Sequence, residues 1–271
     1  MSSEFAWLTI EQVAPLIAKR KLSPRELLAS LYFARQLRSR NHHFRLGRPR
    51  EYYFDHLSSD VANGLEKVTS RFEQAGSEIR EVRLPDLQQA AARCTAFAYA
   101  EATIVHRRMG YFPAREQEYG DDVLHRLKLG AEVRAVDYTA AAEAKRVLQA
   151  ELDAALANVD AILAPTVPLG ATVIGQKTVI IGSREEAVRS AFIRLNRPAN
   201  ITGLPSITVP CGFTSDGLPM GLQLIGRAFC EAQLLQIARL YAESSDRKNV
   251  RPTAIQVSVR VDEQAVTRGA G

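Results

Sequence analysis

Cysteine is scarce in this 271-residue chain, which contains only Cys94, Cys211 and Cys230, far apart in the sequence. An odd number of scattered cysteines excludes a disulfide framework and a cysteine-based zinc site. The five histidines have no partner spacing for a metal site or a Ser-His pair. No Gly-x-Gly-x-x-Gly run joins a strand to a helix, so the glycines predict no phosphate cradle. We therefore expect no metal and no cofactor.

Long apolar runs are also missing. No stretch approaches the roughly 20 residues that a helix needs to cross a bilayer. The first residues, MSSEFAWLTIEQ, are acidic and lack the apolar core of a signal peptide. We expect a cytoplasmic protein without a membrane partner. A hydrophobic content of 46% and a charged content of 24% are ordinary for a globular chain.

The net charge of +5 raises the question of a nucleic-acid partner. Positive charge is densest over residues 35–50, which hold six arginines and the pair His42-His43. No zinc finger, ribonucleoprotein motif or DNA-reading helix pair accompanies this segment. A solvated surface is the simpler interpretation, and we do not expect nucleic acid as a partner.

The most informative stretch covers residues 196–243. Residues 206–213 (SITVPCGF) have the β-branched content of a strand, and Asp216-Gly217 predicts a tight turn into a returning strand over residues 218–226. Residues 231–242 then switch to helical spacing. The inward side chains should be Ile207, Val209, Cys211 and Phe213 on the first strand, Met220, Leu222 and Leu224 on the second, and Leu234, Leu235, Ile237, Ala238 and Tyr241 on the helix.

Capping residues and apolar spacing predict further elements. They are two short helices within residues 1–36, opened by Thr9 with Gln12 and by Ser23 with Pro24 and Glu26; a helix capped by Asp60 and ended by Gly76; long helices over residues 87–108 and 138–158, the second with Val147, Leu148, Leu152 and Leu156 inward; a buried strand over residues 161–164; and a helix capped by Ser183 with Glu186.

The stretch also carries a motif series: Pro198, Asn200, Gly203 and Pro205 in a loop over residues 196–205; Val209, Pro210, Cys211 and Gly212 in the strand; Asp216, Gly217 and Pro219 in the turn; and Gly221, Gln223 and Gly226 in the returning strand. This series resembles that of the amidase signature family. These enzymes are Ser-Ser-Lys amidohydrolases and include the A subunit of glutamyl-tRNA amidotransferase. The N-terminal helix pair is similar to the N-terminal arm of the same family.

The resemblance implies an α/β fold: a partial amidase-signature fold with a mixed β-sheet flanked by helices and its central strands absent. We expect a single incomplete domain over residues 1–271. Residues 1–36 form its N-terminal helical arm, residues 44–245 the C-terminal part of the amidase fold and residues 246–271 a tail. Residues 37–43 form the apparent junction, where the sequence passes over the segment that supplies both serines and the lysine in the family.

No catalytic residue is therefore predicted. The serine pairs Ser58-Ser59 and Ser244-Ser245 lie in helix-capping or tail contexts, and Lys19, Lys21, Lys67, Lys145 and Lys177 match no lysine motif of the family. By resemblance, Asn200 and Thr202 line the acyl side of the amidase pocket, although Asn200 is equally suited to satisfying loop backbone. Glu101 is an acid on an apolar helix, to which we assign a buried, hydrogen-bonded structural role or a place in the pocket wall.

Two hypotheses follow. The first is the inherited class, hydrolysis of a small carboxamide by Ser-Ser-Lys acyl transfer, which is inactive here if nucleophile and base are missing. The second is a non-catalytic binding protein or partner-dependent remnant. The absent strands should leave sheet edges exposed, which predicts a homo-oligomer or a partner chain that covers them.

Overall fold

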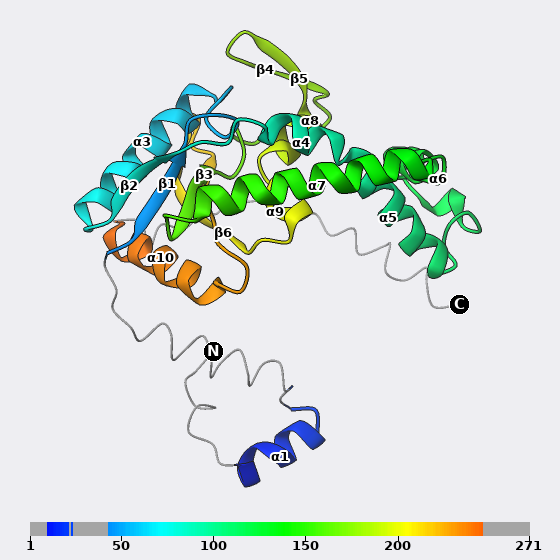
Figure 1. Ribbon diagram of the computed structural model, residues 1–271, viewed down its shortest axis with the longest axis horizontal. Helices are drawn as coiled ribbons and strands as arrows, with labels where there is room; N and C mark the ends of the chain where they lie inside the picture. The colour runs from blue at the N-terminus through cyan, green and yellow to red at the C-terminus, as the bar shows by residue number, and fades with distance from the viewer. Residues whose placement is uncertain (1–9, 22, 24–42, 246–271) are drawn as a thin grey trace, which may run out of the picture.

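The computed structural model describes residues 10–21, 23 and 43–245 of the chain as an assembly of helices around one mixed β-sheet (Figure 1). The second helix predicted in the N-terminal arm, nearly all of the junction at residues 37–43 and the tail over residues 246–271 lie outside the described residues. The elements are α1 (Ile10–Ala18), β1 (Arg45–Pro49), α3 (Ser59–Gln74), β2 (Glu78–Val82), α4 (Leu87–Arg93), α5 (Thr95–Arg108), the 3-10 turn η2 (Glu116–Glu118), α6 (Asp121–Ala131), α7 (Ala135–Leu156), β3 (Ala161–Pro165), β4 (Thr178–Ile181), β5 (Arg184–Ala187), α8 (Val188–Arg194), α9 (Arg197–Thr202), β6 (Ser206–Phe213), β7 (Pro219–Ile225) and α10 (Glu231–Ser244).

The sheet has the strand order β2-β1-β3-β7-β6. Strand β1 pairs in parallel with β2 and β3, whereas β7 runs antiparallel between β3 and β6. The sheet is therefore mixed, as predicted. Within the described residues, β2 and β6 form its two edges.

Helices cover both faces of the sheet. Strand β3 is buried along its whole length, and its side chains alternate between two apolar clusters. Ala161 and Leu163 join the cluster under α3 and α10, while Ile162 and Ala164 join the one under α4, α7 and α9. The predicted strand over residues 161–164 is confirmed. Its sequence is a continuous apolar run because both faces of the strand are buried.

The β6–β7 hairpin and the helix after it are confirmed, but two side chains predicted to face inward do not: Leu235 on α10 is only half-buried and lies outside the core, and Phe213 is exposed. Met220, Leu222 and Leu224 are buried against α3 and α10, and Gly217 takes a positive φ of 79° in the turn. Phe213, however, is 41% exposed. The pairing register shifts between Pro210 and Gly212, and such a bulge reverses the alternation of the side chains after it.

Two helix predictions need correction. The N-cap of α3 is Ser58, whose hydroxyl accepts a hydrogen bond from the Val61 amide, so Asp60 lies inside the first turn. The helix predicted over residues 87–108 is divided at Cys94, where the Thr95 hydroxyl donates to the Ala92 carbonyl. Both halves contact α7, but α4 also packs against α9 and α5 packs mainly against α6. Figure 1 shows α4 beside the sheet and α5 with α6 at the far end of α7.

Three further predictions change locally. Val147 on α7 is 41% exposed, unlike the buried Leu148 and Leu152. Ser183 caps no helix: Gly182 and Ser183 form the two-residue turn between β4 and β5, and α8 begins only at Val188. The expected loop over residues 196–205 contains the short helix α9, which ends at Gly203 with a φ of 75°. In the described part of the chain, no helix is long and apolar enough to cross a membrane.

Candidate functional site

Four polar side chains gather on the face of the β6–β7 hairpin opposite α3 and α10. We call this group the hydroxyl face: Thr166 just after β3, Ser206 and Thr208 on β6, and Gln223 on β7. Thr208 pairs with Gln223 across the hairpin, so the two share one face of the sheet, and Ser206 lies two residues away on the same face. Ser206 and Thr208 are exposed, whereas Gln223 is buried.

Hydrogen bonds link these groups. The Thr166 hydroxyl donates to Thr208 Oγ1 at 3.3 Å, and the Ser206 hydroxyl donates to Gln223 Oε1 at 3.1 Å. Gln223 Nε2 in turn donates to the Leu195 carbonyl at 3.2 Å, which fixes the orientation of the amide. Gly221 makes room for the cluster, because a Cβ there would lie 2.8 Å from Thr166 Oγ1.

This geometry can bind a polar ligand but offers no means of activating a nucleophile. A serine or threonine hydroxyl attacks only when a base lies within hydrogen-bond reach. Within residues 43–245, the hydroxyls of Thr166, Ser206 and Thr208 contact one another and Gln223, and no histidine, lysine or carboxylate hydrogen-bonds to them. Sequence reasoning missed Thr166 and Thr208, because only the strand register brings them together.

The two predicted substrate-binding residues lie on α9. Asn200 is exposed near the end of that helix. The Thr202 hydroxyl donates to the Pro198 carbonyl at 2.8 Å and approaches the Ala199 carbonyl at 3.3 Å, so its proton is held within its own helix. A substrate role for Asn200 and Thr202 stays a prediction.

The serine pairs hold structural positions. Ser58 caps α3, and the Ser244 hydroxyl donates to the Tyr241 carbonyl at the end of α10. None of the six lysines in the described ranges is buried. Lys145 is half-buried, with its ammonium 5.0 Å from the centroid of the Phe97 ring. No described lysine hydrogen-bonds to a hydroxyl of the hydroxyl face, so these positions do not suit the role of a base.

Glu101 differs from its prediction in one respect. It is hydrogen-bonded, because the Tyr138 hydroxyl donates to Glu101 Oε1 at 3.4 Å, but its side chain is exposed and not buried. Its partner Tyr138 lies in the first turn of α7, so Glu101 contacts the exposed beginning of that helix. Desolvation, with a smaller contribution from the Glu101 charge, raises the pKa of Tyr138.

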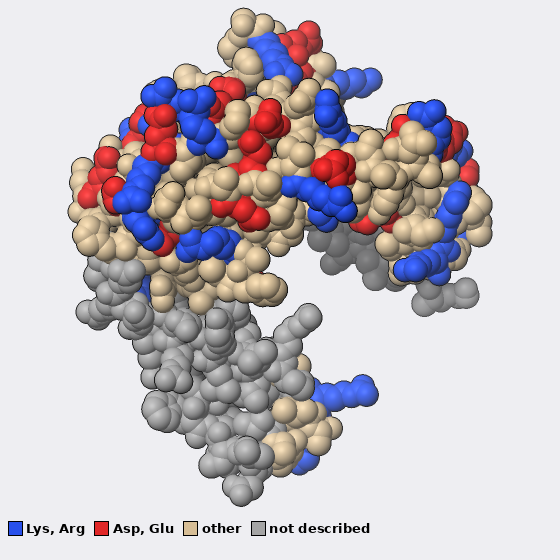
Figure 2. Space-filling view, viewed as in Figure 1, with Lys and Arg blue, Asp and Glu red and all other residues tan. Residues whose placement is uncertain are grey.

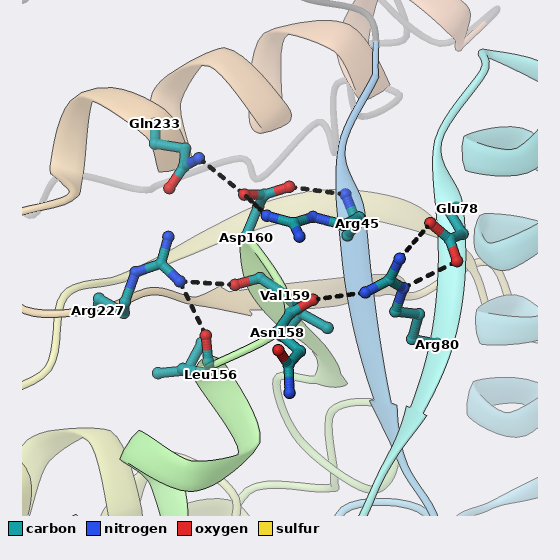
Figure 3. A network of polar contacts seen from close by, with 9 residues as sticks. All are labelled: Arg45, Glu78, Arg80, Leu156, Asn158, Val159, Asp160, Arg227 and Gln233. Carbon is teal, nitrogen blue, oxygen red and sulfur yellow. Dashed lines mark hydrogen bonds and ion pairs between the residues drawn. The ribbon is translucent and has the colours of Figure 1, made fainter.

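A polar network at the start of β1 and β3 is structural (Figure 3). Asp160 accepts hydrogen bonds from the Arg45 amide at 2.8 Å and from Gln233 Nε2 at 3.2 Å, and it forms an ion pair with the Arg45 guanidinium at 3.5 Å. Beside it, Arg227 donates to the Leu156 and Val159 carbonyls at the end of α7. The network thus joins α7, α10 and the sheet, and these polar groups hydrogen-bond to one another or to backbone carbonyls.

The described arginines of the basic segment are paired with acids. Arg45 pairs with Asp160, Arg48 with Glu66, and Arg50 with Glu81. Figure 2 shows Lys and Arg interspersed with Asp and Glu over the visible face. Neighbouring carboxylates offset the positive field of these three arginines. The absence of a nucleic-acid partner stays a prediction.

Comparison with protein families gives a match over most of the chain. The family model described as Amidase matches residues 14–235. Curated relatives include the A subunit of the glutamyl-tRNA(Gln) amidotransferase of Myxococcus xanthus, 32% identical over 225 residues that cover 74% of this chain and 45% of the relative. Its counterpart in Novosphingobium aromaticivorans is 32% identical over 231 residues, covering 77% and 46%. The chain thus spans about half the length of the curated relatives it matches.

Solved structures agree with this result. A crystal structure described as an amidase superposes with a TM-score of 0.68 at 26% identity, covering 74% of this chain and 45% of the other. The A subunit of the glutamyl-tRNA(Gln) amidotransferase from Thermotoga maritima gives a TM-score of 0.57 at 29% identity, covering 75% and 43%. A bacterial aryl acylamidase gives a TM-score of 0.64 at 18% identity, covering 79% of this chain and 46% of the other. At that identity the similarity shows a shared fold alone.

Proposed function

Because this chain belongs to the amidase signature family, we propose that it is a non-hydrolytic member that binds a small carboxamide and does not cleave it unaided. The observation that carries the proposal is the hydroxyl face, where donors and acceptors converge and no described base contacts them. A carboxamide presents one carbonyl acceptor and two N–H donors. Hydroxyl groups, which both donate and accept, complement that pattern, and the exposed Asn200 amide does so as well.

Without a base, the rate of amide cleavage should fall by several orders of magnitude. Removal of single members of a comparable catalytic unit costs factors of about 10⁴ to 10⁶. Here, we propose, the segment that carries both serines and the lysine is absent between residues 36 and 44, so the whole unit is missing. The inherited class would then survive as recognition of the amide without its cleavage.

We further propose that a partner chain or a second copy covers the open side of the sheet. Strand β6 lies at the edge of the described sheet, with Ser206, Thr208 and Pro210 exposed along it. An edge strand with unpaired backbone groups favours the addition of another strand. One structural neighbour, at 21% identity, is described as part of a vestigial protein complex, which is consistent with such an assembly.

The competing proposal is that the isolated chain hydrolyses amides, as its relatives' names suggest. Ammonia release from acetamide, propionamide, benzamide and glutamine, measured beside a full-length amidase, distinguishes the two. We expect no release above the blank, together with saturable binding of at least one amide by calorimetry.

A matched pair of variants tests the site itself. Thr208→Val keeps the shape of the side chain but removes its hydroxyl, and should weaken amide binding several-fold. Thr139→Val makes the same change at an exposed position on α7 and should leave binding unaltered. Turnover of any amide by the isolated chain would refute the non-hydrolytic proposal.

A further inference from the structure

The protein has a second polar hollow, and none of the residues that line it belongs to the hydroxyl face. It has a volume of about 190 Å³ and is bounded by the Tyr52 segment, α4, β5, α8 and the start of α9. Its charged lining consists of Arg184, Arg194, Arg197 and Glu186. Three guanidinium groups against one carboxylate leave a net positive charge around a small space.

Arg194 is held rigidly in this lining. Its Nη2 donates to the His56 carbonyl at 2.8 Å, and its Nη1 donates to the Asp55 carbonyl at 3.4 Å. The same guanidinium forms an ion pair with Glu186 at 3.4 Å. Arg194 therefore anchors the wall, and Glu186 offsets the charge of this arginine.

Arg197 and Arg184 are differently placed. Arg197 Nη2 donates to the Thr95 hydroxyl at 2.7 Å, which positions the guanidinium without neutralising it. Within the described ranges, neither Arg197 nor Arg184 forms an ion pair with a carboxylate. A guanidinium has five N–H donors in a planar fork that matches an oxyanion, so most of the donors on these two arginines are available to a ligand.

The backbone beside the hollow is strained. Tyr52 and His56 have positive φ values of 64° and 54°, although neither is glycine. Arg194 and the Tyr52 hydroxyl, which donates to the Arg194 carbonyl at 2.5 Å, tie this segment to α8. Such strain persists where the surrounding contacts determine the conformation and often accompanies ligand sites.

We propose that this hollow binds a small monocarboxylate with a compact apolar body. The carboxylate would meet Arg197 and Arg184, and the apolar part would lie on Ala91, Ala92 and Ile193, the last of which is 40% exposed. A volume of about 190 Å³ lies below the 300–1,000 Å³ typical of drug-sized ligands, so the ligand has few heavy atoms. Inorganic phosphate has no apolar body to cover Ala91, Ala92 and Ile193, so this lining favours a carboxylate that has one.

The inference does not rest on the amide-binding proposal, since the two sites share no lining residue. Benzoate and benzamide form a suitable probe pair, because they have nearly the same shape and differ in charge. Titration calorimetry of the full chain at low salt should show saturable binding of benzoate, with benzamide binding at least tenfold more weakly to this site. Inorganic phosphate should also bind more weakly than benzoate.

Removing an arginine and removing the glutamate of the hollow should change benzoate binding in opposite directions. Arg197→Gln and Arg184→Gln should each weaken benzoate binding about tenfold or more, because each removes charge-assisted hydrogen bonds. Glu186→Gln should strengthen it several-fold by removing a repulsive charge. Arg146→Gln, an exposed arginine on α7 outside the hollow, should change nothing.

The exposed Arg184 forms no described side-chain contact, so its variant tests the site even if Arg197→Gln fails to fold. Absence of benzoate binding at millimolar concentration, equal binding of benzamide at this site, or weaker binding after Glu186→Gln would each overturn the proposal. Loss of amide binding in Thr208→Val with benzoate binding retained would confirm that the two sites are separate.

Discussion

Tyr52 and Tyr53 are neighbours whose hydroxyls have opposite environments. The Tyr52 hydroxyl donates to the Arg194 carbonyl at 2.5 Å, whereas the buried Tyr53 hydroxyl has no hydrogen-bond partner in the described part of the chain. We expect Tyr52→Phe to lower the free energy of unfolding by about 1 kcal/mol, since a hydrogen bond is lost. Tyr53→Phe should be neutral or stabilising by up to about 1 kcal/mol, because it removes an unsatisfied buried group. Urea unfolding at neutral pH measures both.

The buried Tyr52 hydroxyl also makes the stability of the protein depend on pH. Burial raises the pKa of Tyr52 to about 12 from its ordinary value of 10.0, and the nearby Arg194 and Arg197 charges only partly oppose this. Because the unfolded chain loses the phenolic proton first, the stabilisation is complete below about pH 10 and is lost as pH rises toward 12. Tyr52→Phe should therefore lose less stability than wild type between pH 9 and pH 11. An equal loss in both proteins would contradict the prediction.

At the scale of single residues, sequence reasoning found the apolar positions and missed the polar cluster. Leu222 and Leu224 follow a local alternation that the sequence displays directly. The pairing of Thr166 with Thr208 depends on β7 lying between β3 and β6, and no local pattern states which strands are neighbours. The exposure of Phe213 likewise depends on a bulge that alternation alone does not reveal.

At the scale of elements, the contact of α5 with α6 depends on Gly130. A Cβ there would lie 2.2 Å from the Tyr99 carbonyl oxygen and 2.2 Å from Thr103 Oγ1, and the backbone atom cannot move aside cheaply. We expect Gly130→Ala to destabilise the protein by about 2 kcal/mol or more, as overpacking does. Thermal unfolding followed by circular dichroism provides the measurement.

Gly120, the N-cap of the same helix, is the matched control. Its φ is −65°, and a Cβ there would meet only Asp122 Oδ1, at 3.7 Å. Gly120→Ala should change stability by about 0.5 kcal/mol or less, because the gain in unfolded-state entropy offsets the weaker cap. If the two variants were equally stable, the close packing of α5 on α6 would be wrong.

Elements with a local signature were predictable, and those defined by tertiary packing were not. The β6–β7 hairpin has its turn residues between two apolar runs, and α10 has an unbroken helical spacing. The break at Cys94 arises because α4 packs against α7 beside the sheet while α5 turns to α6, within one alanine-rich run of good helix formers. The Gly182-Ser183 turn did carry a hairpin signal, but Ser183 with Glu186 resembled a capping box.

At the scale of the whole molecule, the open edge of the sheet predicts self-association. Strand β6 has eight residues and no described neighbour on its outer side. Large apolar side chains are also exposed elsewhere, including Ile174 at 102%, Phe229 at 88% and Ile180 at 76%. We expect sedimentation velocity to show association that increases with protein concentration.

A charge on the edge strand tests the cause. Thr208→Lys places an ammonium on an exposed position of β6 and should shift the distribution toward monomer. Thr139→Lys, on the exposed side of α7, should leave the distribution unaltered. A concentration-independent monomer in the wild type would count against both the open edge and the proposed partner.

The mixed pairing of the sheet also orders the events of folding. The hairpin pairs residues 6 to 19 positions apart, whereas the bonds between Arg45 and Asp160 span 115 positions. Closing a longer loop costs more chain entropy, so nearby contacts form sooner. By the same measure, the pairing of β1 with β2, between residues 33 positions apart, precedes the pairing of β3 with β7, and the pairing of β1 with β3 comes last. Each half of the sheet can thus form separately, and the bonds between β1 and β3 unite the two halves.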